Sequence, residues 1–435
     1  MTFLHPRCVG RGPVRQERPR NDVPGVAGSG TAGFNGVMNS GGGAGAGPRD
    51  RTTLNTSTTT TTTTSAAHTP PTPGPLSPTT PDCTPTDWYI GQIPGRARKR
   101  RRPIPAKLPA TTGELRALGL STRAIEKNFV RAEHGIWVPK DTLLSETTDS
   151  GWRRARRIPA ATLALAHLFR HPQRIASGFG AASLYGMTAF VEEELLDILA
   201  SPGATTARAP EHVCLHPTRT IDAHRTRAWK YTDVRGNLGE VRFTDPDTTL
   251  SHMLATVSLP DDARSRRWSV PDLSDLRAGL TQEVIRGIQV SDAFHQTRGW
   301  EATKGEDVLR VPGGVDPLFA GTVLGWTDVG AESPQETLLR LAVSDLAPGL
   351  RSQIPVWTDD GTKLLTSCDL GWEEEGVYLF YDGAHHLQRT QRNHDSKVLA
   401  ALQRNGGRVF RVVAEDLTDL AAVEKLRETV TEALG

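Results

Sequence analysis

Four apolar segments in the C-terminal quarter of this 435-residue chain decide its fold: QIPV (353–356), LLTSCDL (364–370), VYLFYDG (377–383) and RVFRVV (408–413). Their lengths and their β-branched and aromatic residues are typical of strands. Helical patterns lie between the third and fourth segments, over 388–404, and after the fourth, over 420–434. The segments therefore predict a mixed sheet flanked by helices.

A helix start precedes these strands. In Ser333-Pro334-Gln335-Glu336, serine is suited to the N-cap, proline to the first helical position and the acid to the first turn. The helix continues over 337–343. We therefore expect an α/β (α+β) domain over 331–435, with the order helix, three strands, helix, strand and a closing helix.

The N-terminal 102 residues have a different composition. They are rich in Gly, Pro, Ser and Thr, with an unbroken threonine run at 58–64. Such a segment cannot bury enough apolar surface to offset its ordering entropy, so we predict a disordered tail over 1–102. Met38 is an alternative translation start.

The tail is basic: it carries 13 Lys and Arg against 5 Asp and Glu, whereas the rest of the chain carries 38 against 44. Its basic run at 96–102 could contact nucleic acid or an acidic membrane surface, but a solvated linker is the simpler interpretation.

Residues 103–145 have the pattern of a winged helix-turn-helix. A short helix over 111–120 ends at Gly119, Ser121 or Thr122 could cap a second helix containing Phe129 and Val130, and a strand follows at 135–139. The second helix would present three side chains to DNA: Arg123, Lys127 and Asn128. Any small helical hairpin would give a similar pattern.

Residues 150–325 are expected to form an α+β linking region. The predicted helices are 158–187, with a second start near Ser177 or Gly178, then 191–199, 250–257, 273–280 and 283–294, and the predicted strands are 212–216 and 240–243. His212 and His216 are interpreted as ordinary polar positions of a strand rather than zinc ligands.

Cysteine usage and hydropathy limit the class of protein. Cys8, Cys83, Cys214 and Cys368 lie far apart in the sequence without a CxxC pair, which argues against a disulfide framework or a structural zinc site. No apolar run approaches the ~20 residues of a membrane helix, and the N-terminus is a poor signal peptide. A cytoplasmic protein without a membrane partner is expected.

Several short motifs together carry a family resemblance. They are Ser333-Pro334-x-Glu336-Thr337, Asp369-Leu370-Gly371-Trp372, Tyr381-Asp382-Gly383-x-His385-His386, Gln391, Asp395, and Arg411-Val412 followed by Glu415-Asp416-Leu417. In this order they resemble the PD-(D/E)XK nucleases, and more closely the actinobacterial proteins whose C-terminal domain looks like the very-short-patch repair endonucleases. In that family the domain often follows a winged helix similar to that of AbiEi-type antitoxins.

The resemblance implies a metal-dependent endonuclease acting on DNA. Asp369 would be the principal ligand of Mg²⁺, with Asp382 as a second ligand and Glu336 in support. His385 or His386 would carry the proton, and Asp395 would orient one of them. A homodimer is one assembly that such a protein could form.

The sequence departs from the family at position 380. The family usually has Glu two residues before the Asp of the Tyr-Asp-Gly turn, and this chain has Phe380, whose ring cannot bind Mg²⁺. Asp369 and Asp382 remain, and with a backbone carbonyl they could form a one-metal site that supports catalysis. The alternative is a catalytically degenerate DNA-binding transcriptional regulator or antitoxin-like protein.

Overall fold

The computed structural model describes the following residues: 108–144, 157–201, 209–217, 223–232, 238–259, 267–297, 305–328, 330–358, 361–382, 398, 402–404 and 406–435. The tail predicted over 1–102 lies outside them, as do most of the helix predicted over 388–404 and the side chains of His385, His386 and Asp395.

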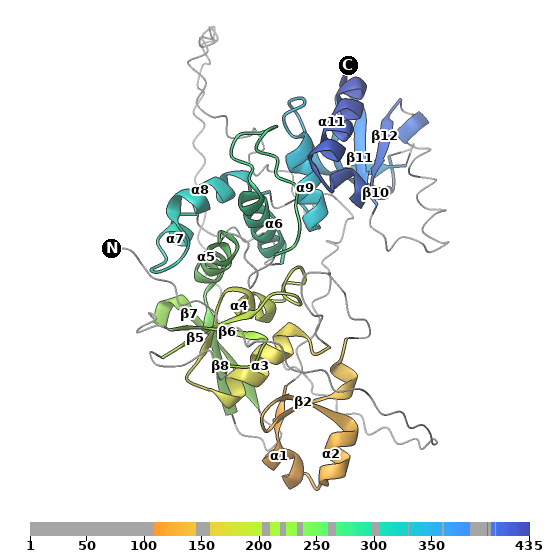
Figure 1. The fold of residues 1–435 in the computed structure, drawn as a ribbon. Coiled ribbons are helices and arrows are strands. Elements are labelled where there is room, and N and C mark those ends of the chain that lie inside the picture. The colour runs from red at the N-terminus through yellow and green to blue at the C-terminus, as the bar shows by residue number, and fades with distance from the viewer. Residues whose placement is uncertain are drawn as a thin grey trace, which may run out of the picture. The chain divides into compact units, whose positions relative to one another are not determined.

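The first described module joins two short helices to a small sheet. It contains β1 (Ala110–Thr111), α1 (Thr112–Ala117), α2 (Thr122–Asn128), β2 (Phe129–Glu133) and β3 (Ile136–Pro139), followed by the short 3-10 helix η2 (Lys140–Thr142). The strands pair in the antiparallel order β1-β3-β2. Thr111 and Glu114 form a reciprocal capping box at α1. Figure 1 shows this module in orange.

One boundary in this module differs from the prediction. Phe129 and Val130 were expected on the second helix, but α2 ends at Asn128 and both residues pair with β3. Phe129 and Val130 are good strand formers, and Gly135, with φ +77°, allows the turn that brings β3 back against them. The partner strand therefore overrides the local helical pattern.

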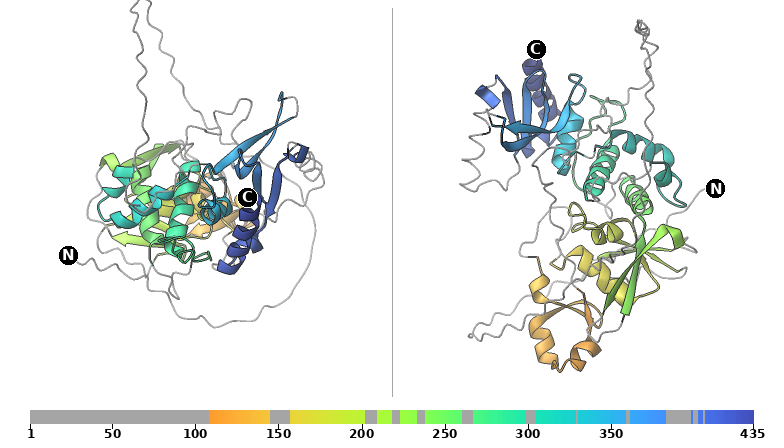
Figure 2. Two further views of the ribbon diagram at one scale, coloured as in Figure 1. Left: turned by 90° about the horizontal axis from the view of Figure 1, so that it is seen from above. Right: turned by 180° about the vertical axis from the view of Figure 1, so that it is seen from behind.

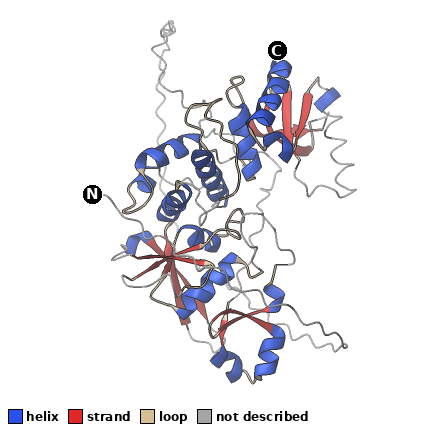
Figure 3. Ribbon diagram, in the orientation of Figure 1, coloured by secondary structure: helices blue, strands red, loops and turns tan. Residues whose placement is uncertain are grey.

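The middle region surrounds a five-stranded mixed sheet, whose order is β6-β5-β4-β8-β7 (Figure 3). Its elements are α3 (Ala160–Arg170), β4 (Ile175–Ala176), α4 (Gly178–Leu184), β5 (Leu196–Ala200), β6 (Val213–Pro217), η4 (Ala223–Arg225), β7 (Thr226–Thr232) and β8 (Leu238–Thr244). The helices that follow are α5 (Pro246–Val257), α6 (Gln282–Thr297), α7 (Gly305–Leu309) and α8 (Pro317–Trp326). The predicted helix start near Ser177 or Gly178 is confirmed by α4.

Two helices predicted in this region are wrong. Residues 196–200, within the predicted helix 191–199, form strand β5, and all five are buried. A strand buried on both faces has no polar alternation, so its pattern cannot be told from a helix. Residues 273–280 form turns instead of a helix, with Leu273 N–H donating to Leu280 O and Gly279 at φ +89°.

The C-terminal region is a four-stranded mixed sheet with helices. It contains α9 (Pro334–Val343), β9 (Arg351–Trp357), β10 (Leu364–Trp372), β11 (Val377–Tyr381), β12 (Arg408–Val412), η5 (Ala414–Leu417) and α11 (Leu420–Leu434). The strand order is β12-β11-β10-β9, with β11 and β12 parallel and the other pairs antiparallel. Helix α9 contacts β10, β11 and α11, and Figures 1 and 2 both place α11 beside the sheet. The expected mixed α/β class is confirmed.

Each face of this sheet has an apolar layer. Leu370, Trp372 and Leu379 pack in the large core cluster that also contains residues of α9 and α11. Ile354 and Cys368 pack in a second cluster with Val398 and Leu402. No helix among the described residues is both long and apolar enough to cross a membrane.

Candidate functional site

Glu336 is fixed at the start of α9 by its own sequence neighbours. Ser333, the N-cap, accepts the Glu336 N–H at 3.2 Å and donates its hydroxyl to Glu336 Oε1 at 2.9 Å. The other oxygen, Oε2, accepts the Glu332 N–H at 2.8 Å. The predicted cap is therefore present, and it also holds the carboxylate of Glu336 in one orientation.

Gln353 on β9 is the third group that holds Glu336. Its Nε2 donates to Glu336 Oε2 at 3.1 Å, and its Oε1 accepts the Ser367 hydroxyl at 2.9 Å. Gln353 is 1% exposed and has φ +57°, a left-handed conformation that a side chain other than glycine rarely adopts. Such strain persists only where the surroundings impose it, and it is concentrated at functional sites.

Asp369 lies on β10 across from Gln353. Cys368 pairs with Ile354 and Leu370 with Ser352. Although Cys368 and Leu370 are two residues apart, they pack in different apolar clusters, so the usual alternation of faces is broken at Asp369. Asp369 Oδ2 accepts the Tyr381 N–H from β11 at 2.7 Å. The Asp369 carboxylate therefore reaches the backbone of the neighbouring strand β11.

The carboxylates of Glu336 and Asp369 repel each other. Burial raises the pKa of Glu336 well above its usual range, and the charge of Asp369 raises it further. The groups that shift this pKa most do not include a cation. The structure thus brings together two of the predicted site residues in a position where a divalent cation with hard oxygen ligands would relieve the repulsion.

Asp382 is placed less centrally than predicted. It follows β11, donates its N–H to Val412 O at 2.8 Å, and its Oδ2 lies 3.4 Å from Arg411 Nη1 in a partly exposed ion pair. Among the described residues, two groups offer three ligand atoms within 4.8 Å of one another, and neither contains Glu336, Asp369 or Asp382. His385, His386 and Asp395 lie outside the described residues, so their expected roles stay predictions.

Phe380 has a packing role. Its partly buried ring belongs to the second apolar cluster, with Ile354, Val398 and Leu402. Phe380 thus contributes to the core on the side of the sheet where Val398 packs. A carboxylate at this position would need a cation or a hydrogen-bond donor to offset its burial.

The predicted DNA-facing residues are on the surface of α2. Arg123, Lys127 and Asn128 are all exposed, while Ile125, at 1% exposure, anchors the helix to the core. Arg123 and Lys127 are four residues apart and therefore lie on the same side of the helix. The side chains are thus free to approach a phosphate backbone.

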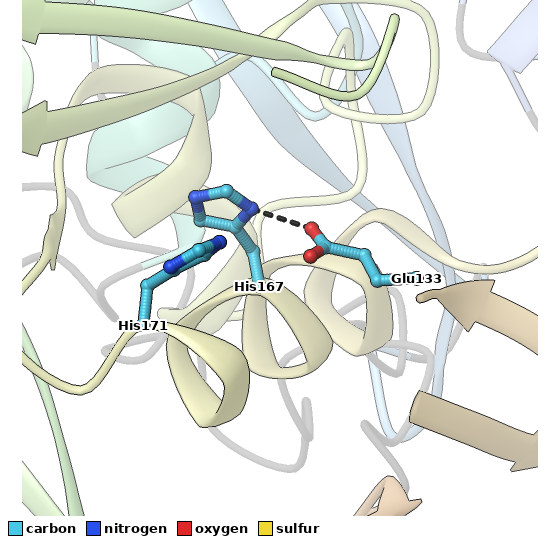
Figure 4. Close-up of side chains that lie close together, drawn as sticks. All are labelled: Glu133, His167 and His171. Carbon is cyan, nitrogen blue, oxygen red and sulfur yellow. Dashed lines mark hydrogen bonds and ion pairs between the residues drawn. The ribbon is translucent and has the colours of Figure 1, made fainter. Parts of the chain in front are cut away.

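Two clusters with histidine ligands were not predicted. The first joins strand β2 to α3 and the residue after it: the carboxylate of Glu133 points at the ring of His167, with the ring of His171 alongside (Figure 4). The spacing of His167, in the last turn of α3, and His171, its C-cap four residues later, is the signal in the sequence. Glu133 had no such signal, because it comes from a strand that was not predicted.

The chain of hydrogen bonds in this first cluster defines its protonation. Arg174 Nη1 donates to His167 Nε2 at 2.7 Å, and since arginine can only donate, the ring proton is on Nδ1 and is donated to Glu133 Oε1 at 2.5 Å. Burial, followed by the charge of Arg174, lowers the pKa of His171 to about 4. In this arrangement the imidazole of His167 bridges the carboxylate of Glu133 and the guanidinium of Arg174.

The second cluster consists of Asp197 on β5 with Cys214 and His216 on β6. Its acid was missed because β5 was predicted as helix, and His216 was predicted to be an ordinary polar residue.

Comparison with known proteins gives no family: no protein-family model and no curated protein matches this chain.

Proposed function

We propose that this protein acts on DNA and that residues 331–435 form an endonuclease-like domain that hydrolyses phosphodiester bonds with the help of Mg²⁺. The observation that carries the proposal is the pair formed by Glu336 and Asp369, two carboxylates from α9 and β10 that are close enough for one to raise the pKa of the other. Such a pair disfavours ionisation of both acids at once, and a cation between or beside the two groups would stabilise their charged forms. A domain with only a structural role has no need of it.

The donor set supports the choice of cation. Glu336 and Asp369 offer only oxygen, and Mg²⁺ prefers few carboxylates and keeps several waters. When bound, the ion would activate a water and neutralise the charge that builds on the phosphate. Gln353 and Ser333 hold Glu336 in position, and the Tyr381 N–H holds Asp369.

A second function has one observation in its favour. Phe380 occupies the position of the usual glutamate and packs in an apolar cluster, which supports a domain that has kept its fold and lost turnover. The exposed α2 with Arg123 and Lys127 would then make the protein a DNA-binding transcriptional regulator or an antitoxin-like protein.

Cleavage of supercoiled plasmid and of mismatched duplexes by the full chain separates the two functions. The reactions contain Mg²⁺ or Mn²⁺, and the test variant is Asp369→Ala. The matched control is Glu374→Ala, which removes an exposed acid from the turn after β10. Nicking that is lost in Asp369→Ala and kept in Glu374→Ala supports the nuclease.

The opposite result supports the regulator. If the full chain binds DNA but neither it nor the control variant cleaves, the nuclease proposal is wrong for the present sequence. Cleavage gained in Phe380→Glu, with the variant still folded, would then show that the site lost one ligand and kept the rest.

A further inference from the structure

The sheet of the middle region brings three ligand types to one place. Strands β5 and β6 are parallel, with Asp197 paired to Cys214 and Leu199 paired to His216. Cys214 and His216 are two residues apart on β6 and therefore point to the same face of the sheet. One oxygen of Asp197, the sulfur of Cys214 and one ring nitrogen of His216 all lie within 4.8 Å of one another.

Asp197 is held rigidly at the centre of this cluster. Its Oδ2 accepts the Phe179 N–H at 3.0 Å, and its Oδ1 accepts from His216 Nε2 at 2.8 Å. The residue is 3% exposed. The backbone of α4 approaches so closely that a side chain at Gly178 would overlap the Asp197 carboxylate, and a Cβ at Gly180 would lie 2.6 Å from its backbone oxygen. The absence of side chains at Gly178 and Gly180 thus leaves space for Asp197.

Asp197 is the buried member of the cluster, and His216 is more exposed to solvent. The side chain of Asp197 is 5% exposed, whereas that of His216 is 33% exposed. An ion could therefore enter past the imidazole and reach a carboxylate already fixed by a backbone N–H. Hydrogen bonding of ligating groups to the surrounding protein is the usual arrangement at metal sites.

We propose that Asp197, Cys214 and His216 form a binding site for Zn²⁺. Thiolate, imidazole and carboxylate are the three side-chain ligands that Zn²⁺ prefers, and a set of three leaves one tetrahedral position for a water or a fourth group. The hydrogen bond between Asp197 and His216 would be replaced by two bonds to the ion, the ring proton would move from Nε2 to Nδ1, and the thiol proton of Cys214 would be released to solvent. This site lies in the middle region and is independent of the proposed nuclease function.

The first histidine cluster is less suited to binding a metal ion. Glu133, His167 and His171 also present three ligand atoms within 4.8 Å, but Arg174 Nη1 lies 2.7 Å from His167 Nε2. Binding of a metal at Nδ1 would move the ring proton to Nε2, against the guanidinium, and the positive charge of Arg174 would repel the ion. Glu133, His167 and His171 therefore serve as the internal control.

The Ser177–His252 pair lies next to the proposed site. Ser177 donates its N–H to Asp197 O at 2.9 Å, and its Oγ lies 2.5 Å from His252 Nδ1. His252 Nε2 makes no hydrogen bond with any residue that the structure describes. Burial lowers the pKa of His252 to about 4, and the nearby His216 lowers it further, whereas Asp197 acts in the opposite direction.

The experiment is metal binding by the full chain after treatment with a chelator. Zn²⁺ affinity is measured by competition with a chromophoric chelator, and Co²⁺ is used as a spectroscopic probe, because a thiolate ligand gives a sulfur-to-cobalt charge-transfer band. We expect one Zn²⁺ per chain, a charge-transfer band, and a thermal midpoint that rises with Zn²⁺. Cys214→Ser and His216→Gln should each weaken Zn²⁺ binding roughly 100-fold or more, since even outer partners of a metal site are worth about 10–100-fold.

The controls make the assignment specific. His171→Gln should leave Zn²⁺ affinity unchanged, and both cluster variants should keep the circular-dichroism spectrum of the wild-type chain, because Cys214 and His216 are only partly buried. The proposal is wrong if the chain binds no Zn²⁺, or if the charge-transfer band survives in Cys214→Ser. Survival of the band would point to another thiol, from Cys8, Cys83 or Cys368.

Discussion

Gln353 donates a 3.1 Å hydrogen bond to Glu336 while its own backbone is held in the left-handed region, at φ +57°. The residue lies across from Asp369, where the alternation of β10 is broken. Gln353 therefore bonds one of the two carboxylates that the proposed function uses and lies across the sheet from the residue that carries the other. Each of these features can be tested by substitution.

Replacing Gln353 should separate backbone strain from side-chain bonding. Alanine and glycine both remove the bonds to Glu336 and Ser367, but only glycine adopts a positive φ without cost. We expect both variants to be destabilised, and Gln353→Ala to be less stable than Gln353→Gly by ~1 kcal/mol. Urea unfolding measures the difference, and equal stabilities would show that Gln353 is not strained.

Glu336 should make folding depend on pH and on divalent cations. Because the pKa of Glu336 is raised in the folded chain, its contribution to stability is largest at low pH and is lost as pH rises above the usual range of glutamate. The stability of the wild type relative to Glu336→Gln should therefore fall as pH increases. Thermal unfolding across that range tests this sign.

Mg²⁺ or Mn²⁺ should reverse this effect. A cation between Glu336 and Asp369 favours the charged carboxylates, so it should raise the thermal midpoint of the wild type at neutral pH more than that of Glu336→Gln. Glu374→Ala is again the matched control and should respond as the wild type does. Equal responses in all three proteins would argue against a cation at this pair.

The cluster around His171 should weaken the fold in acid. The pKa of His171 is lowered to about 4 by burial and by Arg174, His167 and Arg170, while Glu133 acts in the opposite direction. The unfolded chain takes up a proton near pH 6.5, so stability should fall as pH drops from about 6.5 to 4. His171→Gln should lose less stability over this range than the wild type, and the exposed His224→Gln should behave as the wild type.

A buried ion pair fastens α6 to α9. Arg340 Nη2 lies 2.9 Å from Asp292 Oδ2, with both side chains at most 2% exposed, and Thr337 donates to the same oxygen at 2.8 Å. Asp292→Ala would remove the 2.9 Å partner of the buried Arg340 guanidinium, whose contact with Asp328 is longer, at 3.5 Å. We expect a loss of ~3–5 kcal/mol from this single change, and a smaller loss when Arg340→Met is added. The urea unfolding midpoints of Asp292→Ala and of the double variant, compared with that of the wild type, test this expectation.

The sequence predicted those parts of the site that depend on neighbouring residues. The cap at Ser333 and the position of Glu336 follow from four consecutive residues, and the strand that carries Asp369 follows from its apolar pattern. The contact between Glu133 and His167 spans 34 residues and depends on β2, a strand that its partner β3 induces. No local pattern could indicate it.

Asp197 was missed for a different physical reason. All five residues of β5 are buried, so the alternation that identifies a half-exposed strand is absent. The left-handed Gln353 was also beyond prediction, since glutamine has no local preference for a positive φ. In both cases the tertiary environment imposes a backbone conformation that the local sequence does not favour.

DNA binding through α2 should depend on few charges. Residues 108–144 carry five Lys and Arg against four Asp and Glu, so a general electrostatic attraction is weak and the exposed Arg123 and Lys127 must provide the phosphate contacts. Each lost contact should lower the slope of log affinity against log salt by about one. Arg123→Gln with Lys127→Gln should therefore reduce the slope by about two, as measured by fluorescence anisotropy on a duplex. Arg310→Gln, an exposed charge on the turn after α7, should leave the slope unchanged, and an equal reduction there would mean that α2 is not the DNA-binding surface.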